Sequence, residues 1–205
     1  MDTDQQRPQL YLITPPVFDP GSFPDQLAAV LDAQPVACLR LALATRDEDE
    51  LSRAADALRE VAHARDVALV IERHVLLAAR LGLDGVHLTE AGRGYRAARA
   101  ELGDDAIVGA FCAASRHDGL TVAEAGADYV SFGPVSGALG DGTTAPLELF
   151  QWWSEMIEIP VVAEGGLTPE LLPALAEACD FLGFGDEIWS EDDPAAALNR
   201  LVALY

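Results

Sequence analysis

The sequence contains no lysine, and all 13 of its basic residues are arginines. No mechanism that needs a lysine amine, as a base or as a Schiff-base nucleophile, can therefore operate here. Acidic residues are abundant by contrast, because 34 aspartates and glutamates give the 205 residues a formal net charge of −21. A field of this sign repels nucleic acids and anionic membranes, so we expect neither as a partner. We interpret the acidity as a solvated surface rather than as a site for a cationic partner.

Long apolar runs are also missing, although half of the residues are hydrophobic. No run approaches the roughly 20 residues that a transmembrane helix requires. The polar residues 1–8 lack the basic and apolar parts of a secretory signal, and we expect them to be disordered. These features predict a soluble, cytoplasmic protein. Cys38, Cys112 and Cys179 are odd in number and lie in or beside apolar segments, which indicates buried thiols rather than disulfides.

Short apolar segments alternate along the chain with longer segments whose apolar residues recur at helical spacing. The predicted strands cover residues 9–14, 36–43, 67–72, 85–88, 106–112, 129–135, 160–166 and 181–185. The predicted helices cover residues 24–33, 47–65, 75–81, 93–102, 117–125, 147–157, 169–179 and 194–204. Such alternation is typical of parallel strands that are buried on both faces. We therefore predict one domain over residues 1–205, a single (β/α)8 TIM barrel, somewhat shorter than the roughly 250 residues usual for that fold.

The competing architecture is an open, doubly wound sheet that binds a dinucleotide. Its fingerprint is a G-x-G-x-x-G turn directly after the first strand. The sequence has Thr14, Pro15 and Pro16 at that point. The dinucleotide-binding alternative therefore loses its main support.

Glycines gather where the last two predicted strands end, at Gly165, Gly166 and Gly185. In a barrel, such turns can offer backbone N–H groups to a phosphate. The same glycines can also serve only to form tight turns, and their spacing does not decide between the two interpretations. The loop after the sixth strand, residues 136–145, is rich in glycine and threonine, and we expect it to be mobile.

Three segments and the opening strand carry a family resemblance. They are DGVHL at 84–88, GADYV followed by FGPV at 126–135, PVVAEGG at 160–166 and LYLIT at 10–14. In order and spacing they resemble the thiamine phosphate synthase/TenI family, which includes thiazole tautomerases, over nearly the whole chain. The resemblance implies a TIM barrel of thiamine biosynthesis that binds a small-molecule substrate at the carboxyl ends of its strands.

The resemblance also implies a Mg²⁺ ion held by acidic residues, and here the chain departs from the family pattern. An Asn-Asp pair that ends the family's third strand is matched by Glu72 and Arg73. A later aspartate is matched by Gly92, with Glu90 close by. An arginine in place of a Mg²⁺ ligand removes an oxygen donor and adds a repelling charge. Metal binding is therefore doubtful, with Glu72 and Glu90 as the remaining candidate ligands.

Contacts to pyrophosphate are altered as well, because the family's lysines are absent. Arg40 on the second strand can keep one such contact or can be a purely structural arginine. Thr143 and Thr144 lie near the family's Thr-Lys pair, but threonine cannot replace the lysine charge. We expect the synthase reaction, which joins a pyrimidine pyrophosphate to a thiazole phosphate, to be impaired.

A proton transfer on the thiazole, the reaction of the tautomerase relatives, needs neither Mg²⁺ nor pyrophosphate contacts. The resemblance places its histidine after the fifth strand, where this chain has Ser115 and His117, a few residues beyond the ungapped match to Cys112 and Ala114. Histidine suits general acid–base catalysis. A surface histidine at the start of a helix is the plainer interpretation, and His87 we expect to be structural.

The phosphate turn itself is acidic, with Glu164, Asp186 and Glu187 around the glycines. These carboxylates can cap N–H groups in place of an anion, or can form a pocket for a cationic or uncharged ligand. The sequence thus supports two hypotheses: a thiamine-biosynthetic enzyme that binds a thiazole phosphate or similar ligand, and a non-catalytic or regulatory ligand-binding barrel with an acidic mouth. It leaves a homodimer open.

Overall fold

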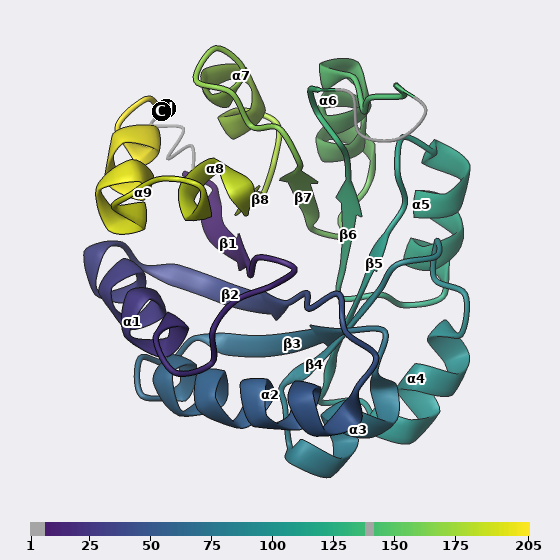
Figure 1. The fold of residues 1–205 in the computed structure, drawn as a ribbon. Helices are drawn as coiled ribbons and strands as arrows, with labels where there is room; N and C mark the ends of the chain where they lie inside the picture. Colours follow the sequence, from purple (N-terminus) through teal and green to yellow (C-terminus); the bar gives the residue numbers. More distant parts are fainter. Residues whose placement is uncertain (1–6, 138–141) are drawn as a thin grey trace.

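The computed structural model of the protein describes residues 7–137 and 142–205. Eight parallel strands close into a barrel in chain order, and helices surround it (Figure 1). This arrangement confirms the predicted (β/α)8 barrel and excludes the open sheet. Most of the N-terminal segment predicted to be disordered, residues 1–6, and part of the loop predicted to be mobile, residues 138–141, lie outside the described residues. Pro8 is placed, and it is buried.

The strands are short and the helices vary in length. The strands are β1 Gln9–Ile13, β2 Val36–Leu41, β3 Ala68–Glu72, β4 Gly85–Leu88, β5 Ile107–Phe111, β6 Tyr129–Phe132, β7 Val161–Glu164 and β8 Phe181–Phe184. The helices are α1 Phe23–Ala33, α2 Glu48–His63, α3 Val75–Leu81, α4 Tyr95–Leu102, α5 Arg116–Glu124, α6 Leu147–Met156, α7 Leu172–Ala176, α8 Asp186–Trp189 and α9 Pro194–Val202. Within residues 7–137 and 142–205, none of these helices has both the length and the apolar character of a membrane span.

Several predicted elements run too far at their ends. The prediction for β6 continued to residue 135, but the strand ends at Phe132, before Pro134, which has no N–H to donate to a neighbouring strand. The predicted start of α7 at Pro169 was also wrong. The backbone N–H groups of Leu171 and Leu172 both donate to the carbonyl of Thr168, so a separate turn precedes the helix. The predicted start of α9 is confirmed, since Asp193 accepts from the N–H of Ala196 and caps the helix.

Helix α8 was not predicted. It has four residues, too few to show a helical period in the sequence. Trp189 at its end donates its indole N–H to the carbonyl of Ile13 at 2.7 Å, which fastens α8 to the end of β1. The element matters because it starts directly after Gly185, one of the candidate phosphate-binding glycines.

The core has two parts because alternate residues of a parallel barrel strand face opposite sides. Side chains facing outward pack against the helices, as Phe132 does against Phe150 and Trp153. Side chains facing inward fill the barrel, and Tyr11, Cys38, Val70, Tyr129 and Val162 form this inner cluster. The expectation of buried thiols is confirmed for Cys38 and Cys112, whereas Cys179 is partly buried.

Gly109 on β5 makes room inside the barrel. A Cβ added there would lie 2.0 Å from the ring of Tyr129. We expect Gly109→Ala to lower the free energy of unfolding by about 1–3 kcal/mol, because the ring must move within a close-packed interior. Urea denaturation measures this. Gly21→Ala is the control, since its Cβ would have neighbours no nearer than 3.6 Å. Equal stability of the two variants would contradict the prediction.

Candidate active site

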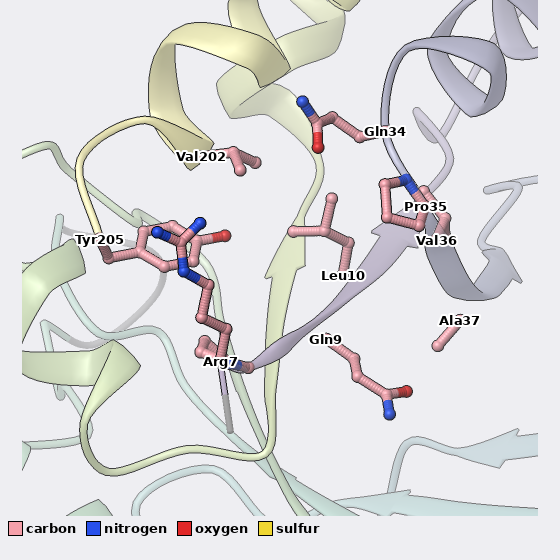
Figure 2. Close-up of a pocket in the computed structure, with 10 residues that line it drawn as sticks. Arg7, Gln9, Leu10, Gln34, Pro35, Val36, Ala37, Val202 and Tyr205 are labelled. Carbon is pink, nitrogen blue, oxygen red and sulfur yellow. The ribbon is translucent and has the colours of Figure 1, made fainter. Parts of the chain in front are cut away.

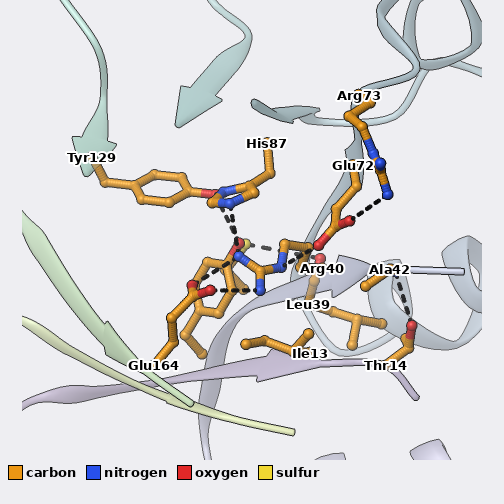
Figure 3. A network of polar contacts seen from close by, with 12 residues as sticks. Ile13, Thr14, Leu39, Arg40, Ala42, Glu72, Arg73, His87, Tyr129 and Glu164 are labelled. Carbon is orange, nitrogen blue, oxygen red and sulfur yellow. Dashed lines mark hydrogen bonds and ion pairs between the residues drawn. The ribbon is translucent and has the colours of Figure 1, made fainter. Parts of the chain in front are cut away.

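Polar side chains meet inside the barrel, and four of the five come from the carboxyl-terminal part of their strands, the side at which TIM barrels carry their chemistry, whereas Tyr129 is the first residue of β6. Arg40 comes from β2, Glu72 from β3, His87 from β4, Tyr129 from β6 and Glu164 from β7 (Figure 3). Each occupies an inward position of its strand. The alternation that buries the inner cluster therefore also brings these five residues together.

Arg40 is at the centre of this group and is only 4% exposed. Its guanidinium donates to both carboxylate oxygens of Glu164, at 2.8 Å and 3.1 Å. Its Nε lies 3.3 Å from Oε1 of Glu72, close enough for an ion pair but without hydrogen-bond geometry. Burial opposes the charged form, but Glu164 and the other partners outweigh it, so the pKa of Arg40 is raised. The guanidinium is thus held between two carboxylates of the protein itself.

His87 continues the network away from Arg40. Its Nε2 lies 2.8 Å from an Arg40 Nη, and since arginine can only donate, Nε2 accepts and the ring is neutral. The proton is then on Nδ1, which donates to the hydroxyl of Tyr129 at 2.8 Å. That hydroxyl lies 2.7 Å from the hydroxyl of Tyr11. Burial, and then the charge of Arg40, lower the pKa of His87, and burial raises the pKa of both tyrosines.

Both nitrogens of His87 are used in this chain of hydrogen bonds, and the residue is 1% exposed. It therefore positions Arg40 and Tyr129 rather than offering a free base. This arrangement agrees with the structural role expected from the sequence.

The candidate metal ligands do not form a Mg²⁺ site. Glu72 is taken up by Arg40 and by Arg73, whose Nη2 lies 3.4 Å from Oε2 of Glu72. Glu90 is exposed and pairs with Arg93 at 3.3 Å. No three acidic, histidine or cysteine side chains converge in the described part of the chain. Arg73 also has a φ of 64°, in the left-handed region that asparagine and aspartate adopt more readily than arginine. The donor set does not suit Mg²⁺, which prefers several oxygen ligands.

The glycine turns after β7 and β8 bind a carboxylate of the chain. Oε1 of Glu187 accepts from the N–H groups of Gly166, at 2.8 Å, and Leu167, at 3.0 Å. Oε2 accepts from the N–H of Gly185 at 2.8 Å. Gly165 and Gly166 have φ values of 77° and 76°, which favour glycine. The two turns therefore present three N–H groups that converge on one carboxylate, that of Glu187.

The other two acids near the turns behave differently. Glu164 points into the barrel toward Arg40, as Figure 3 shows. Asp186 is exposed, and its backbone carbonyl accepts a hydrogen bond from the hydroxyl of Ser190. Of the three acids that the sequence places around the phosphate turns, Glu187 alone binds their N–H groups among the described contacts.

The candidate proton-transfer residues follow β5: Cys112 and Ser115 lie between β5 and α5, and His117 lies in α5 itself. Ser115 caps α5 by accepting from the N–H of Asp118 at 3.2 Å. Cys112 is 1% exposed, and burial raises the pKa of its thiol to about 12. His117 lies in the first turn of α5 and is exposed. Thr143 and Thr144 are exposed residues before α6.

A cavity of about 400 Å³ lies at the opposite end of the barrel, where β1 and β2 begin (Figure 2). Arg7, Gln9, Gln34 and Tyr205 are among its lining residues. TIM barrels place their catalytic residues at the carboxyl ends of the strands. We therefore do not assign the chemistry to this cavity.

Sequence reasoning missed two parts of the site. The first is the chain of hydrogen bonds from Arg40 through His87 and Tyr129 to Tyr11. Alternate residues of a strand share a face, so Arg40 lies on the same inward face of β2 as Cys38. Tyr129 and Ser131 share the inward face of β6 in the same way, and this alternation could have indicated the chain. The second is the contact of Glu187 with both glycine turns. The sequence offered capping of these N–H groups by Glu164, Asp186 or Glu187 as one alternative, but it could not single out Glu187, because the contact depends on the unpredicted helix α8.

The closed parallel barrel, with helices around it and glycine turns after its last two strands, places the chain in the class of (β/α)8 TIM barrels. A family model described as thiamine monophosphate synthase matches residues 10–181, and the chain belongs to this family. It is 46% identical over 201 residues to the thiamine-phosphate synthase of Rhodospirillum centenum, covering 95% of this chain and 97% of the relative. It is 41% identical to that of Erythrobacter litoralis, covering 92% and 91%.

The fold has a close counterpart among solved structures. The thiamine phosphate pyrophosphorylase from Pyrococcus furiosus superposes with a TM-score of 0.82 at 22% identity, over 98% of this chain and 96% of that one. At this identity the likeness supports the fold alone.

The Arg40–Glu164 pair allows a direct test of the network. We expect Arg40→Met to lower the free energy of unfolding by about 3–5 kcal/mol, because it leaves the Glu164 carboxylate buried without its partner. The double variant Arg40→Met, Glu164→Leu should recover most of that loss. Arg65→Met is the control, because Arg65 pairs at 2.7 Å with Asp32, whose side chain is 65% exposed. Loss of this surface ion pair should lower the free energy of unfolding by less than about 1 kcal/mol. Denaturant unfolding compares all three, and a double variant as unstable as Arg40→Met would refute the buried-charge explanation.

Proposed function

We propose that this member of the thiamine monophosphate synthase family binds a thiazole phosphate or a similar small ligand at the carboxyl end of its barrel, and that its coupling reaction is impaired. The observation that carries the proposal is the position of Arg40. Its guanidinium is buried and already bound to Glu164, Glu72 and His87. A pyrophosphate would have to displace these partners before it could use the charge.

The charge around the site also supports an impaired coupling reaction. A pyrophosphate leaving group needs cations to stabilise it in the transition state. Glu164 and Glu72 instead place two carboxylates beside Arg40, and Thr143 and Thr144 carry no charge. The donors around Glu72 and Glu90 do not suit Mg²⁺, as described above, and we assign no step to that ion.

Proton transfer on a bound thiazole would be harmed less by these departures. Helix α5 begins after the carboxyl end of β5, so His117 lies on the mouth side of the barrel. Its imidazole is exposed and belongs to a residue type suited to general acid–base catalysis, whereas burial raises the pKa of the Cys112 thiol to about 12 and keeps that thiol neutral. We assign the proton transfer to His117, with Ser115 fixing the start of its helix. Gly165, Gly166 and Gly185 are the proposed anion donors.

A second candidate function is a non-catalytic or regulatory barrel. The observation that favours it is the Glu187 carboxylate, which already occupies the N–H groups of Gly166, Leu167 and Gly185. A ligand without an anionic group would then suit the acidic mouth better than a phosphate. Titration of the purified protein with thiazole phosphate separates the two, because the regulatory candidate predicts no binding of that compound.

We expect the purified protein, given Mg²⁺ and both family substrates, to form thiamine phosphate more slowly than about 0.1 per second, two decades below the median enzyme. The physical reason is the combined loss of metal and pyrophosphate contacts, since one oxyanion-type contact alone can contribute about a hundredfold in rate. A discontinuous assay of thiamine phosphate measures the rate. Faster turnover would mean that other residues compensate and that coupling is intact.

For the proton transfer, we expect His117→Ala to slow solvent deuterium incorporation into bound thiazole phosphate by about a hundredfold. His63→Ala serves as the control, because His63 pairs with Asp84 on the surface and has no place in the site. Mass spectrometry of the recovered thiazole measures the exchange. Equal exchange in both variants would remove His117 from the reaction.

A further inference from the structure

The contact between Glu187 and the two glycine turns has a consequence for ligand binding that the family assignment does not supply. We propose that Glu187 is an internal competitor for anions, so that a phosphate binds the turns after β7 and β8 only by displacing this carboxylate. The inference rests on the proposed function, since it concerns the same turns, and it makes Glu187 the residue that sets their preference for phosphate over uncharged ligands.

The geometry of the contact is that of a bound oxyanion. Three backbone N–H groups from two separate turns converge on one carboxylate, and both of its oxygens accept. Gly166 and Leu167 follow β7, whereas Gly185 follows β8. A phosphate group accepts from backbone N–H groups in the same way. The carboxylate and a phosphate would therefore compete for the same donors.

The charge of Glu187 is compensated by these backbone groups. Among the described residues, no arginine or histidine forms an ion pair with it within 4.0 Å, and the nearby Arg200 pairs with Glu191 at 2.9 Å. A phosphate placed on the same N–H groups would meet an uncompensated like charge. Both anions cannot occupy the turns together.

A cavity next to Glu187 can receive its carboxylate when a phosphate displaces it. Glu187 borders a cavity of about 590 Å³ between the turn that precedes α7 and the helices α8 and α9, and its lining includes Thr168, Ser190 and the ion-paired Glu191 and Arg200. The side chain is partly buried rather than enclosed. Rotation toward this cavity would free the three N–H groups without unfolding α8.

The test compares Glu187→Ala with the matched control Asp186→Ala, which removes the same charge from the exposed neighbouring residue. The probe is inorganic phosphate, and the readout is the titration of the backbone amide signals of Gly166, Leu167 and Gly185 by NMR. We expect phosphate to bind Glu187→Ala at least about tenfold more tightly than the unmodified protein, which corresponds to about 1.4 kcal/mol. Asp186→Ala should bind within about twofold of the unmodified protein.

A second variant guards against a folding defect. In Glu187→Gln the amide oxygen can still accept from Gly166 and Leu167, but the amide NH₂ cannot accept from Gly185. This variant should fold, and it should also gain phosphate affinity. Equal affinity in Glu187→Gln and the unmodified protein, or an equal gain in Asp186→Ala, would overturn the inference.

The outcome is separable from that of the proposed function. Suppose that the Glu187 variants bind inorganic phosphate more tightly at the three amides, but that thiazole phosphate binds neither them nor the unmodified protein. The inference then stands and the proposed ligand is wrong. If thiazole phosphate binds the unmodified protein tightly and Glu187→Ala adds nothing, the proposed ligand stands and the internal competitor is wrong.

Discussion

A single buried guanidinium organises the mouth side of this barrel. Arg40 is enclosed by strands, and a charge in that position requires compensation within the protein. Glu164 supplies it through two hydrogen bonds, Glu72 adds a second carboxylate, and His87 is forced into one neutral tautomer because Arg40 donates to it. The orientation of Tyr129 and its contact with Tyr11 follow from that tautomer. The positions of side chains from six strands thus depend on one cation.

The same balance of charge limits the chemistry. A reaction in which pyrophosphate is the leaving group needs cations that can stabilise the departing anion. This chain has no lysine, its buried arginine is neutralised from within, and its N–H-rich turns hold a carboxylate. Each feature reduces the attraction of the mouth for anions. The chain keeps the family architecture, and these three features are the basis for proposing that its coupling reaction is impaired.

The architecture could be predicted from the sequence because it depends on local patterns of apolar residues. Apolar strands, helical spacing and their strict alternation specify the barrel, and the acid-proline start of α9 is a local signal as well. The site could be predicted only in part. The sequence indicated Gly165, Gly166 and Gly185, but the partners of Arg40 depend on which strand ends become neighbours across the barrel. The role of Glu187 depends on a four-residue helix, which is too short to leave a periodic pattern.

The closure of the barrel between β1 and β8 also bears on how the chain folds. Gln9 pairs with Phe181, so β1 and β8 are neighbours in the barrel although almost the whole sequence lies between them. Pairings of such long separation are slow to form, and until then β1 presents an unpaired edge. Partly folded chains with open edges tend to associate through them. The net charge of −21 adds an electrostatic repulsion between two such chains, and this repulsion opposes their association during folding as well as between folded molecules.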